Sequence, residues 1–168
     1  MSSMQLVGLP TFTQTLSALD KILDKLAAHC EAGKIDEGVF LNARLFPDMF
    51  AFARQIQLVS DFAKGAAARL SGSEVPAWAD DEKTIAELKA RLAKTRDYLA
   101  GFPASAFDGA DDRVVKMRLG RNAPETEMPG RVFLANIALP NFYFHATAAY
   151  SILRHNGVAL GKSDFMNR

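Results

Sequence analysis

Two polar residues near the C-terminus have a spacing that allows chemistry in a helical protein. Asn141 and His145 are four residues apart in a stretch with helical periodicity, so both side chains lie on one side of the helix. Across the core of a helical bundle they could face Gln57 or Asp61 of an earlier helix and bind a metal ion or a small polar ligand. The alternative is a buried His145 that hydrogen-bonds to a neighbouring group, as most buried polar side chains do.

The other candidates for chemistry are weaker. Cys30 directly follows His29, but neighbouring residues of a helix point about 100° apart, so the pair is not a nucleophile with its base. Residues 161–163 imitate the end of a phosphate-binding loop, yet the glycine needed five residues earlier is Asn156. The sequence shows no acid pair, Ser-His-Asp order or glycine-rich fingerprint.

The first two elements that must position these residues are helices. Thr11 and Gln14 have the spacing of a capping box, and apolar residues then recur every three or four positions, which predicts a helix that ends at Gly33. Residues 36–45 are typical of a short helical turn or irregular connection. A second apolar stripe predicts a helix over 47–70, since proline favours a helix start, and its small residues after position 64 indicate close packing.

A third helix and an irregular insertion follow. Thr84 and Glu87 supply a second capping-box spacing, and the apolar stripe after them predicts a helix that ends at Gly101. The next segment contains many glycines and prolines and cannot form a long helix. Alternating apolar residues over 115–119 predict a strand, which we expect to pair with 132–134 in a small hairpin.

The last helix is predicted roughly over 140–156, with Gly157 as its cap and room for a preceding turn before Pro140. The tail after it should dock on the bundle through Val158, Leu160 and Phe165. Four helices with apolar stripes, and an insertion between the third and the fourth, favour an all-α four-helix bundle over a βαβ arrangement.

Composition limits the classes of function. With 168 residues and 49% apolar content, the chain is expected to form one domain over 1–168. A net charge of +1 argues against nucleic acid and anionic lipid as partners. The sequence has no leader-like start and no run of eighteen apolar residues, so we expect no membrane partner. Cys30 is the only cysteine, which suits a reducing compartment, and we expect a cytoplasmic protein.

The chain resembles a known bacterial family in two stretches, residues 42–64 (NARLFPDMFAFARQIQLVSDFAK) and residues 139–165 (LPNFYFHATAAYSILRHNGVALGKSDF). It is an uncharacterised domain-of-unknown-function family, assigned to the DinB/YfiT-like superfamily of four-helix bundles that are regarded as metalloenzymes. The resemblance covers nearly the whole chain and implies the DinB-like fold. It also implies a site at the bundle centre, where three histidines typically hold a divalent metal, one from the second helix and two spaced His-x-x-x-His on the fourth.

The match to this histidine pattern is partial. The second histidine of the spaced pair matches His145, whereas the position four residues earlier is Asn141. The second helix has no histidine, and Gln55, Gln57 and Asp61 are its polar groups near the expected depth. Zinc and nickel bind amide oxygens poorly, so a divalent metal (zinc, nickel or manganese) at His145 would need a carboxylate such as Asp61. We therefore expect a degenerate or absent metal site.

These observations lead to three hypotheses of function. In the first, the protein binds a small ligand in the central cavity near Asn141, His145, Gln57 and Asp61, with a degenerate or absent metal site. In the second, implied only by the resemblance, it is a divergent metal-dependent enzyme with thiol-transfer-like chemistry, and the metal would be held by His145 and substitute ligands. In the third it is a structural module without catalysis.

The third hypothesis includes a homodimer formed by the last helix. Phe142, Tyr143, Phe144 and Tyr150 place rings on more than one side of that helix, more than a single bundle can bury. Either a second subunit packs on some of them, or the hairpin segment or Trp78 covers them.

Overall fold

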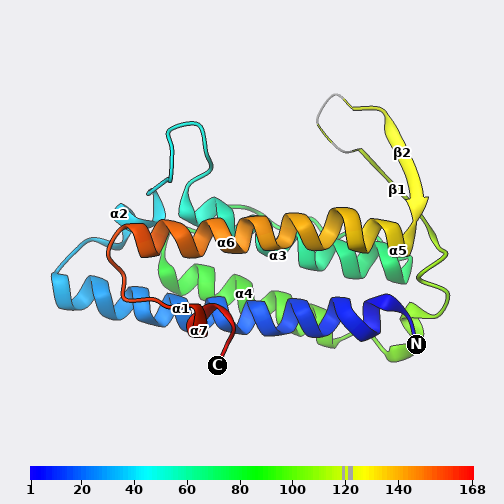
Figure 1. The fold of residues 1–168 in the computed structure, drawn as a ribbon, viewed down its shortest axis with the longest axis horizontal. Helices are drawn as coiled ribbons and strands as arrows, with labels where there is room; N and C mark the ends of the chain where they lie inside the picture. The colour runs from blue at the N-terminus through cyan, green and yellow to red at the C-terminus, as the bar shows by residue number, and fades with distance from the viewer. Residues whose placement is uncertain (119, 121–122) are drawn as a thin grey trace.

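The protein is a bundle of long helices arranged in two layers, with α1 beside α4 and α3 beside α6 (Figure 1). The structure is a computed structural model that describes residues 1–118, 120 and 123–168. The predicted all-α bundle with a small hairpin insertion is confirmed. None of the described helices is both long and apolar enough to cross a lipid bilayer. The helices are α1 (Leu9–Gly33), α2 (Glu37–Leu41), α3 (Phe52–Ser71), α4 (Ile85–Ala100), α5 (Gly130–Phe133), α6 (Leu139–His155) and α7 (Lys162–Phe165), and the strands are β1 (Val114–Arg118) and β2 (Glu125–Pro129).

The core between the two layers fixes the rotation of α6. Phe12 of α1 and Phe142 of α6 are fully buried, and their rings meet edge to face with centroids 4.8 Å apart. Burying one such side chain contributes roughly 1.5–3 kcal/mol. Because His145 lies three residues after Phe142, about one helical turn, the same packing directs the imidazole towards α3.

α1 and α6 begin at Leu9 and Leu139, within two residues of the predicted starts, but further helical turns precede both of them. The first helical segment begins at Met4 and the last at Gly130, so Pro10 and Pro140 lie inside longer helical stretches. Each proline follows a π-helical turn, Met4–Gly8 or Leu134–Ala138. A proline lacks the N–H for a regular helical bond and clashes with the carbonyl four residues back, and the wider turn makes room for it. Thr11 is therefore not a helix cap.

The start of α3 also differs from the prediction. The helix begins at Phe52 and not at Pro47, because the backbone N–H of Phe52 donates to the carbonyl of Ala43 at 3.0 Å and closes residues 43–51 into a loop. In contrast, the capping box predicted for α4 is confirmed. Thr84 accepts from the backbone N–H of Glu87, and the Glu87 carboxylate accepts from the backbone N–H of Thr84.

The insertion before the last helix contains a two-stranded hairpin, as predicted, but with a different second strand. β1 pairs antiparallel with β2, so that Val115 lies opposite Met128. The predicted partner, residues 132–134, is helical because Phe133 and Leu134 are buried and begin the apolar stripe that continues into α6. Leu119, the predicted end of the first strand, lies outside the described residues.

The C-terminal tail docks on the bundle as predicted. Val158 and Leu160 are buried, and the ring of Phe165 meets that of Tyr150 with centroids 5.8 Å apart. An ion pair of 2.7 Å between Lys25 of α1 and Asp164 of α7 adds a polar attachment.

Candidate functional site

His145 lies in a polar pair inside the bundle. Its Nδ1 is 2.7 Å from Oε1 of Gln55 on α3, and its ring stacks on Phe62 with centroids 5.5 Å apart. The Nε2 of Gln55 donates to the carbonyl of Phe50 at 3.1 Å, which turns Oε1 towards the imidazole, so Nδ1 carries the hydrogen. This is the second of the two arrangements that the sequence allowed, a buried histidine bonded to a neighbour.

The hydrogen bonds and ion pairs of the other three predicted site residues go to partners other than His145 among the described residues. Gln57 lies two residues beyond Gln55, which turns its side chain about 200° around α3, away from α6. The structure does not link the four side chains by polar bonds, and a role in ligand binding stays a prediction for each. Their partners are the carbonyl of Ile137 for Asn141 (2.7 Å), Glu82 for Gln57 (2.9 Å), and Lys64 and Arg91 for Asp61 (2.9 and 3.0 Å).

The groups around His145 do not fit a divalent metal. Its neighbours are one amide and two phenylalanine rings, and its Nδ1 hydrogen is engaged by Gln55. Burial, and next the positive charge of Arg54, lower the pKa of His145, and the same charge repels a cation. Within the described ranges no three His, Cys, Asp or Glu side chains lie close enough together to hold a metal ion. Asp61, the carboxylate that the sequence offered, lies on another face of α3.

A cluster of charges occupies that other face. The Arg91 side chain of α4 is only 2% exposed and reaches Asp61 at 3.0 Å, Asp80 at 2.9 Å and Glu82 at 2.8 Å. Burial opposes its charge, but the hydrogen bond to Glu82 and the fields of Glu82, Asp61 and Asp80 outweigh it and raise the pKa of Arg91. These bonds fasten the α3–α4 connection, residues 72–84, to the two helices that it joins.

Trp78 gives the connection a second attachment. The ammonium groups of Lys64 on α3 and Lys94 on α4 each lie 4.4 Å from its ring centroid, a distance at which a cation is attracted by the indole π-system. Lys64 is buried and also pairs with Asp61 at 2.9 Å. The connection is thus held as a fixed wall beside α3.

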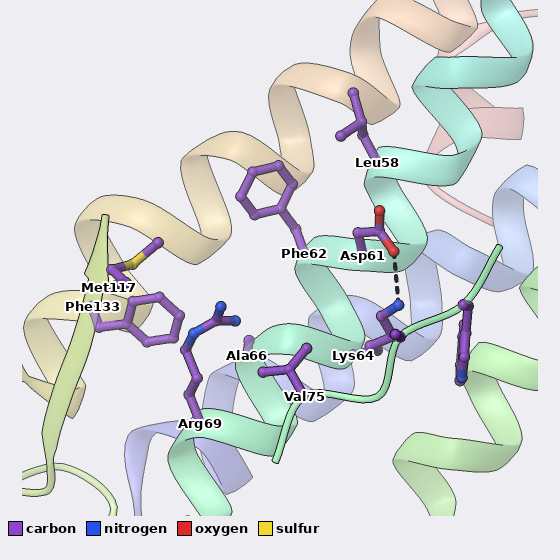
Figure 2. Close-up of a pocket in the computed structure, with 11 residues that line it drawn as sticks. Leu58, Asp61, Phe62, Lys64, Ala66, Arg69, Val75, Met117 and Phe133 are labelled. Carbon is purple, nitrogen blue, oxygen red and sulfur yellow. Dashed lines mark ion pairs between the residues drawn. The ribbon is translucent and has the colours of Figure 1, made fainter. Parts of the chain in front are cut away.

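A groove opens between this wall and the hairpin, along the outer side of α3. We call it the α3 groove. It has a volume of about 340 Å³, within the range of small-molecule sites. Figure 2 shows that its walls come from three parts of the chain that are distant in sequence. They are Leu58, Phe62 and Arg69 of α3, Val75 and Trp78 of the connection, and Met117 of β1 with Phe133 of α5.

Arg69 is the polar residue of this groove whose charge is not balanced. Its guanidinium is half-buried, 6.0 Å from the ring centroid of Phe133, and donates to the carbonyl of Gly65 at 3.1 Å. In the part of the chain that the structure describes, no carboxylate forms an ion pair with it. Burial alone lowers its pKa, with no contribution from an acidic neighbour. Arginine stays protonated even so, and the groove therefore holds a positive charge.

Reasoning from the sequence missed Arg69, although a signal was present. A glycine inside a helix costs roughly 1 kcal/mol relative to alanine, so Gly65 in the middle of α3 needs a reason. A Cβ atom at that position would come within 2.7 Å of Nη1 of Arg69. Glycine at this position makes room for the side chain four residues later, and the spacing Gly65 to Arg69 could have been noticed.

The aromatic side chains of the last helix divide into two groups. Phe142 is buried, and Tyr150 packs on Phe165, whereas Tyr143 and Phe144 remain 42% and 59% exposed. The residues beside the exposed rings are Leu45 and Met49 of the loop before α3. Trp78 does not cover them, because it packs on Lys64 and Tyr98. A homodimer through this face stays a prediction, which sedimentation of the wild type and of Phe144→Ser tests directly.

Comparisons with known proteins agree with the fold. A family model described as a domain of unknown function (DUF1993) matches residues 5–166. Among solved structures, the chain is similar to a crystal structure of a DinB family member protein from Shewanella denitrificans, with 39% sequence identity and a TM-score of 0.86. The similarity covers 94% of this chain and 88% of that one. Among curated proteins, nothing matches the chain.

Proposed function

The chain belongs to the family described as a domain of unknown function (DUF1993) and has a DinB-like helical fold, and from this fold and its side-chain geometry we propose that the protein binds a small organic ligand in the α3 groove. The site lies on the flank of α3, whereas the sequence predicted a cavity in the bundle centre.

One observation carries the proposal, the half-buried cation of Arg69 in a groove with apolar walls. A few convergent polar groups among apolar and aromatic side chains are typical of small-molecule sites. A buried charge without a partner is costly, and a bound ligand that neutralises it would recover part of that cost. The groove combines this charge with a volume of about 340 Å³.

The surroundings of His145 offer less to a ligand. The hydrogen on Nδ1 is engaged by Gln55, and Gln55 is held in turn by the carbonyl of Phe50. Phe62 and Phe144 lie against the ring, and the charge that acts on the imidazole is the cation of Arg54. The metal-dependent enzyme of the second hypothesis is therefore supported only by the resemblance to the superfamily.

Thermal-shift screening of the purified protein with a library of small organic compounds tests this function. We expect some compounds to raise the melting temperature of the wild type by a few degrees, since ligands that bind the folded state stabilise it. Val75→Phe narrows the groove at an exposed position and should abolish these shifts, whereas His145→Gln should retain them. Shifts that survive in Val75→Phe and vanish in His145→Gln would place the site in the bundle centre and contradict the proposal.

A further inference from the structure

We infer that the ligand of the α3 groove is an amphipathic carboxylate, whose head pairs with Arg69 and whose apolar body lies against Phe62 and Phe133. The inference rests on the proposed function and gives the chemical class of the ligand. Three features of the groove carry it.

The first feature is the number of donors that Arg69 has left. A guanidinium carries five N–H donors in a planar fork, and the hydrogen bond to Gly65 engages Nη1 only. The fork matches the two oxygens of a carboxylate, with which arginine forms paired, charge-assisted hydrogen bonds. One guanidinium without an acidic partner corresponds to a ligand with a single negative charge.

The second feature is that the acid of the groove would not repel such a ligand. Asp61 lines the groove, but its Oδ1 is shared between Lys64 at 2.9 Å and Arg91 at 3.0 Å, so its charge is neutralised within the protein. Lys64 is engaged by the same carboxylate and by the ring of Trp78. The net charge of the lining is positive, and it is located at Arg69.

The third feature is the apolar wall around that charge. Phe62, Val75, Met117 and Phe133 line the groove, and Figure 2 shows the Arg69 guanidinium beside Phe133. A ligand with only a charged head would leave these side chains in water, whereas an alkyl chain or an aromatic ring would cover them. The wall thus selects for acids with an apolar body.

Gly65 prepares Arg69 for this role. An alanine Cβ at position 65 would lie 2.7 Å from Nη1, so the flexible end of the Arg69 side chain would have to shift. With glycine, the side chain is held against α3 by the bond to the Gly65 carbonyl before a ligand arrives. Holding a binding group in its bound conformation lowers the entropic cost of binding.

The fluorescence of Trp78 tests the inference, because it is the only tryptophan of the chain and lines the groove. The wild-type protein is titrated with 4-phenylbutanoate and octanoate, and in parallel with the corresponding neutral amides. We expect saturable changes with both acids and at least about tenfold weaker binding of the amides, since one charge-assisted contact is typically worth a factor of this size.

Three variants locate the effect. Arg69→Gln should weaken binding of the acids at least about tenfold and leave binding of the amides unchanged. Gly65→Ala should also weaken acid binding, although alanine is the better helix former and should keep or raise thermal stability. Arg154→Gln, which removes an exposed arginine of α6, is the matched control and should bind as the wild type does.

Each contrary result has a distinct meaning. If acids and amides bind equally well, or if Arg69→Gln still binds the acids, the ligand is not a carboxylate held by Arg69. The groove would then remain a candidate ligand site. If Trp78 fluorescence responds to neither the acids nor the amides, the inference is wrong. The thermal-shift screen then tests independently whether the groove binds any small organic ligand. If Arg69→Gln loses both ligand binding and cooperative thermal unfolding, the loss of binding reflects misfolding. The binding of the acids to Gly65→Ala then serves as the test of the inference.

Discussion

The two polar regions that α3 helps to form differ in how far their polar groups are satisfied by the protein. On the side of α6, Nδ1 of His145 is hydrogen-bonded to Oε1 of Gln55. The amide nitrogen of Gln55 donates in turn to the carbonyl of Phe50. Further along α3, in the groove, Arg69 has one hydrogen bond to its own helix and no carboxylate partner among the described residues. The comparison is the reason why we propose the ligand site at Arg69, whose charge has no partner, and not at His145, whose residue type alone suggested a site.

The two regions are close neighbours. Gln55, Phe62 and Arg69 follow each other at steps of seven residues, so they lie on one stripe of α3. Phe62 belongs to both regions, because its ring stacks on His145 and also lines the groove. The difference between the regions thus comes from what other elements place opposite the stripe, α6 in one case and the connection and hairpin in the other.

The largest loss of folding stability is expected from a change at Arg91, which holds the wall of the groove. Arg91→Met should destabilise the protein by about 3 kcal/mol, because it removes the cation shared by three carboxylates, at least one of them mostly buried. Urea unfolding measures the difference. Arg96→Met is the control and should cost less than about 1 kcal/mol, since Arg96 has a single, more exposed ion pair of 3.6 Å. Equal losses in the two variants would show that the Arg91 cluster does not hold the connection.

A smaller effect is expected on the side of His145. Gln55→Leu should cost about 2 kcal/mol, because it leaves the buried Nδ1 hydrogen and the carbonyl of Phe50 without partners. The double variant Gln55→Leu with His145→Phe removes the imidazole as well and should recover part of the loss. A Gln55→Leu protein as stable as the wild type in urea would mean that His145 is not satisfied by Gln55, and the contrast between the two regions would fail.

The pH dependence of stability should separate the regions further. Because burial and Arg54 lower the pKa of His145, the unfolded chain binds a proton at a higher pH than the folded protein does. The free energy of unfolding should therefore fall as the pH drops below about 6.5, by at most about 1.4 kcal/mol per pH unit for this one group. Urea unfolding between about pH 7 and pH 5 should show a weaker dependence in His145→Gln, and identical slopes would refute the assignment.

The smallest effect is expected from added metal. Zinc, nickel or manganese should change the melting temperature of the wild type by less than about 1 °C, since one imidazole and one amide near Arg54 make a poor ligand set. His145→Gln serves as the control for metal bound elsewhere. A rise in melting temperature in the wild type that is lost in His145→Gln would restore the metal site implied by the superfamily.

Much of the fold could be predicted from the sequence because it depends on local signals. The apolar stripes, the capping box at Thr84 and Glu87, and the docking of Phe165 all follow from residues close together in the chain or from one periodicity. The full extent of the helical turns before α1 and α6 could not be predicted in this way. Pro10 and Pro140 usually mark a helix start, and only the π-helical turns before them allow the helix to begin earlier.

The site was harder to predict, since it depends on which faces of the helices meet. The sequence placed Gln57 and Asp61 opposite His145, but their rotation around α3 follows from the true helix register and from the Arg91 cluster on the other face. The groove is built from three segments that only the folded chain brings together. The glycine at position 65, in the middle of a helix, was the one local feature of the sequence that pointed to Arg69 and the groove.

The most direct test of the central claim is an NMR titration of the isotopically labelled protein with 4-phenylbutanoate. The account predicts that the largest chemical-shift changes occur at the Trp78 indole N–H and the Arg69 Nε–H, both in the α3 groove, while the side-chain amide of Asn141 does not move. Changes centred on Asn141 and His145, with the Trp78 and Arg69 signals unchanged, would place the ligand in the bundle centre and contradict it.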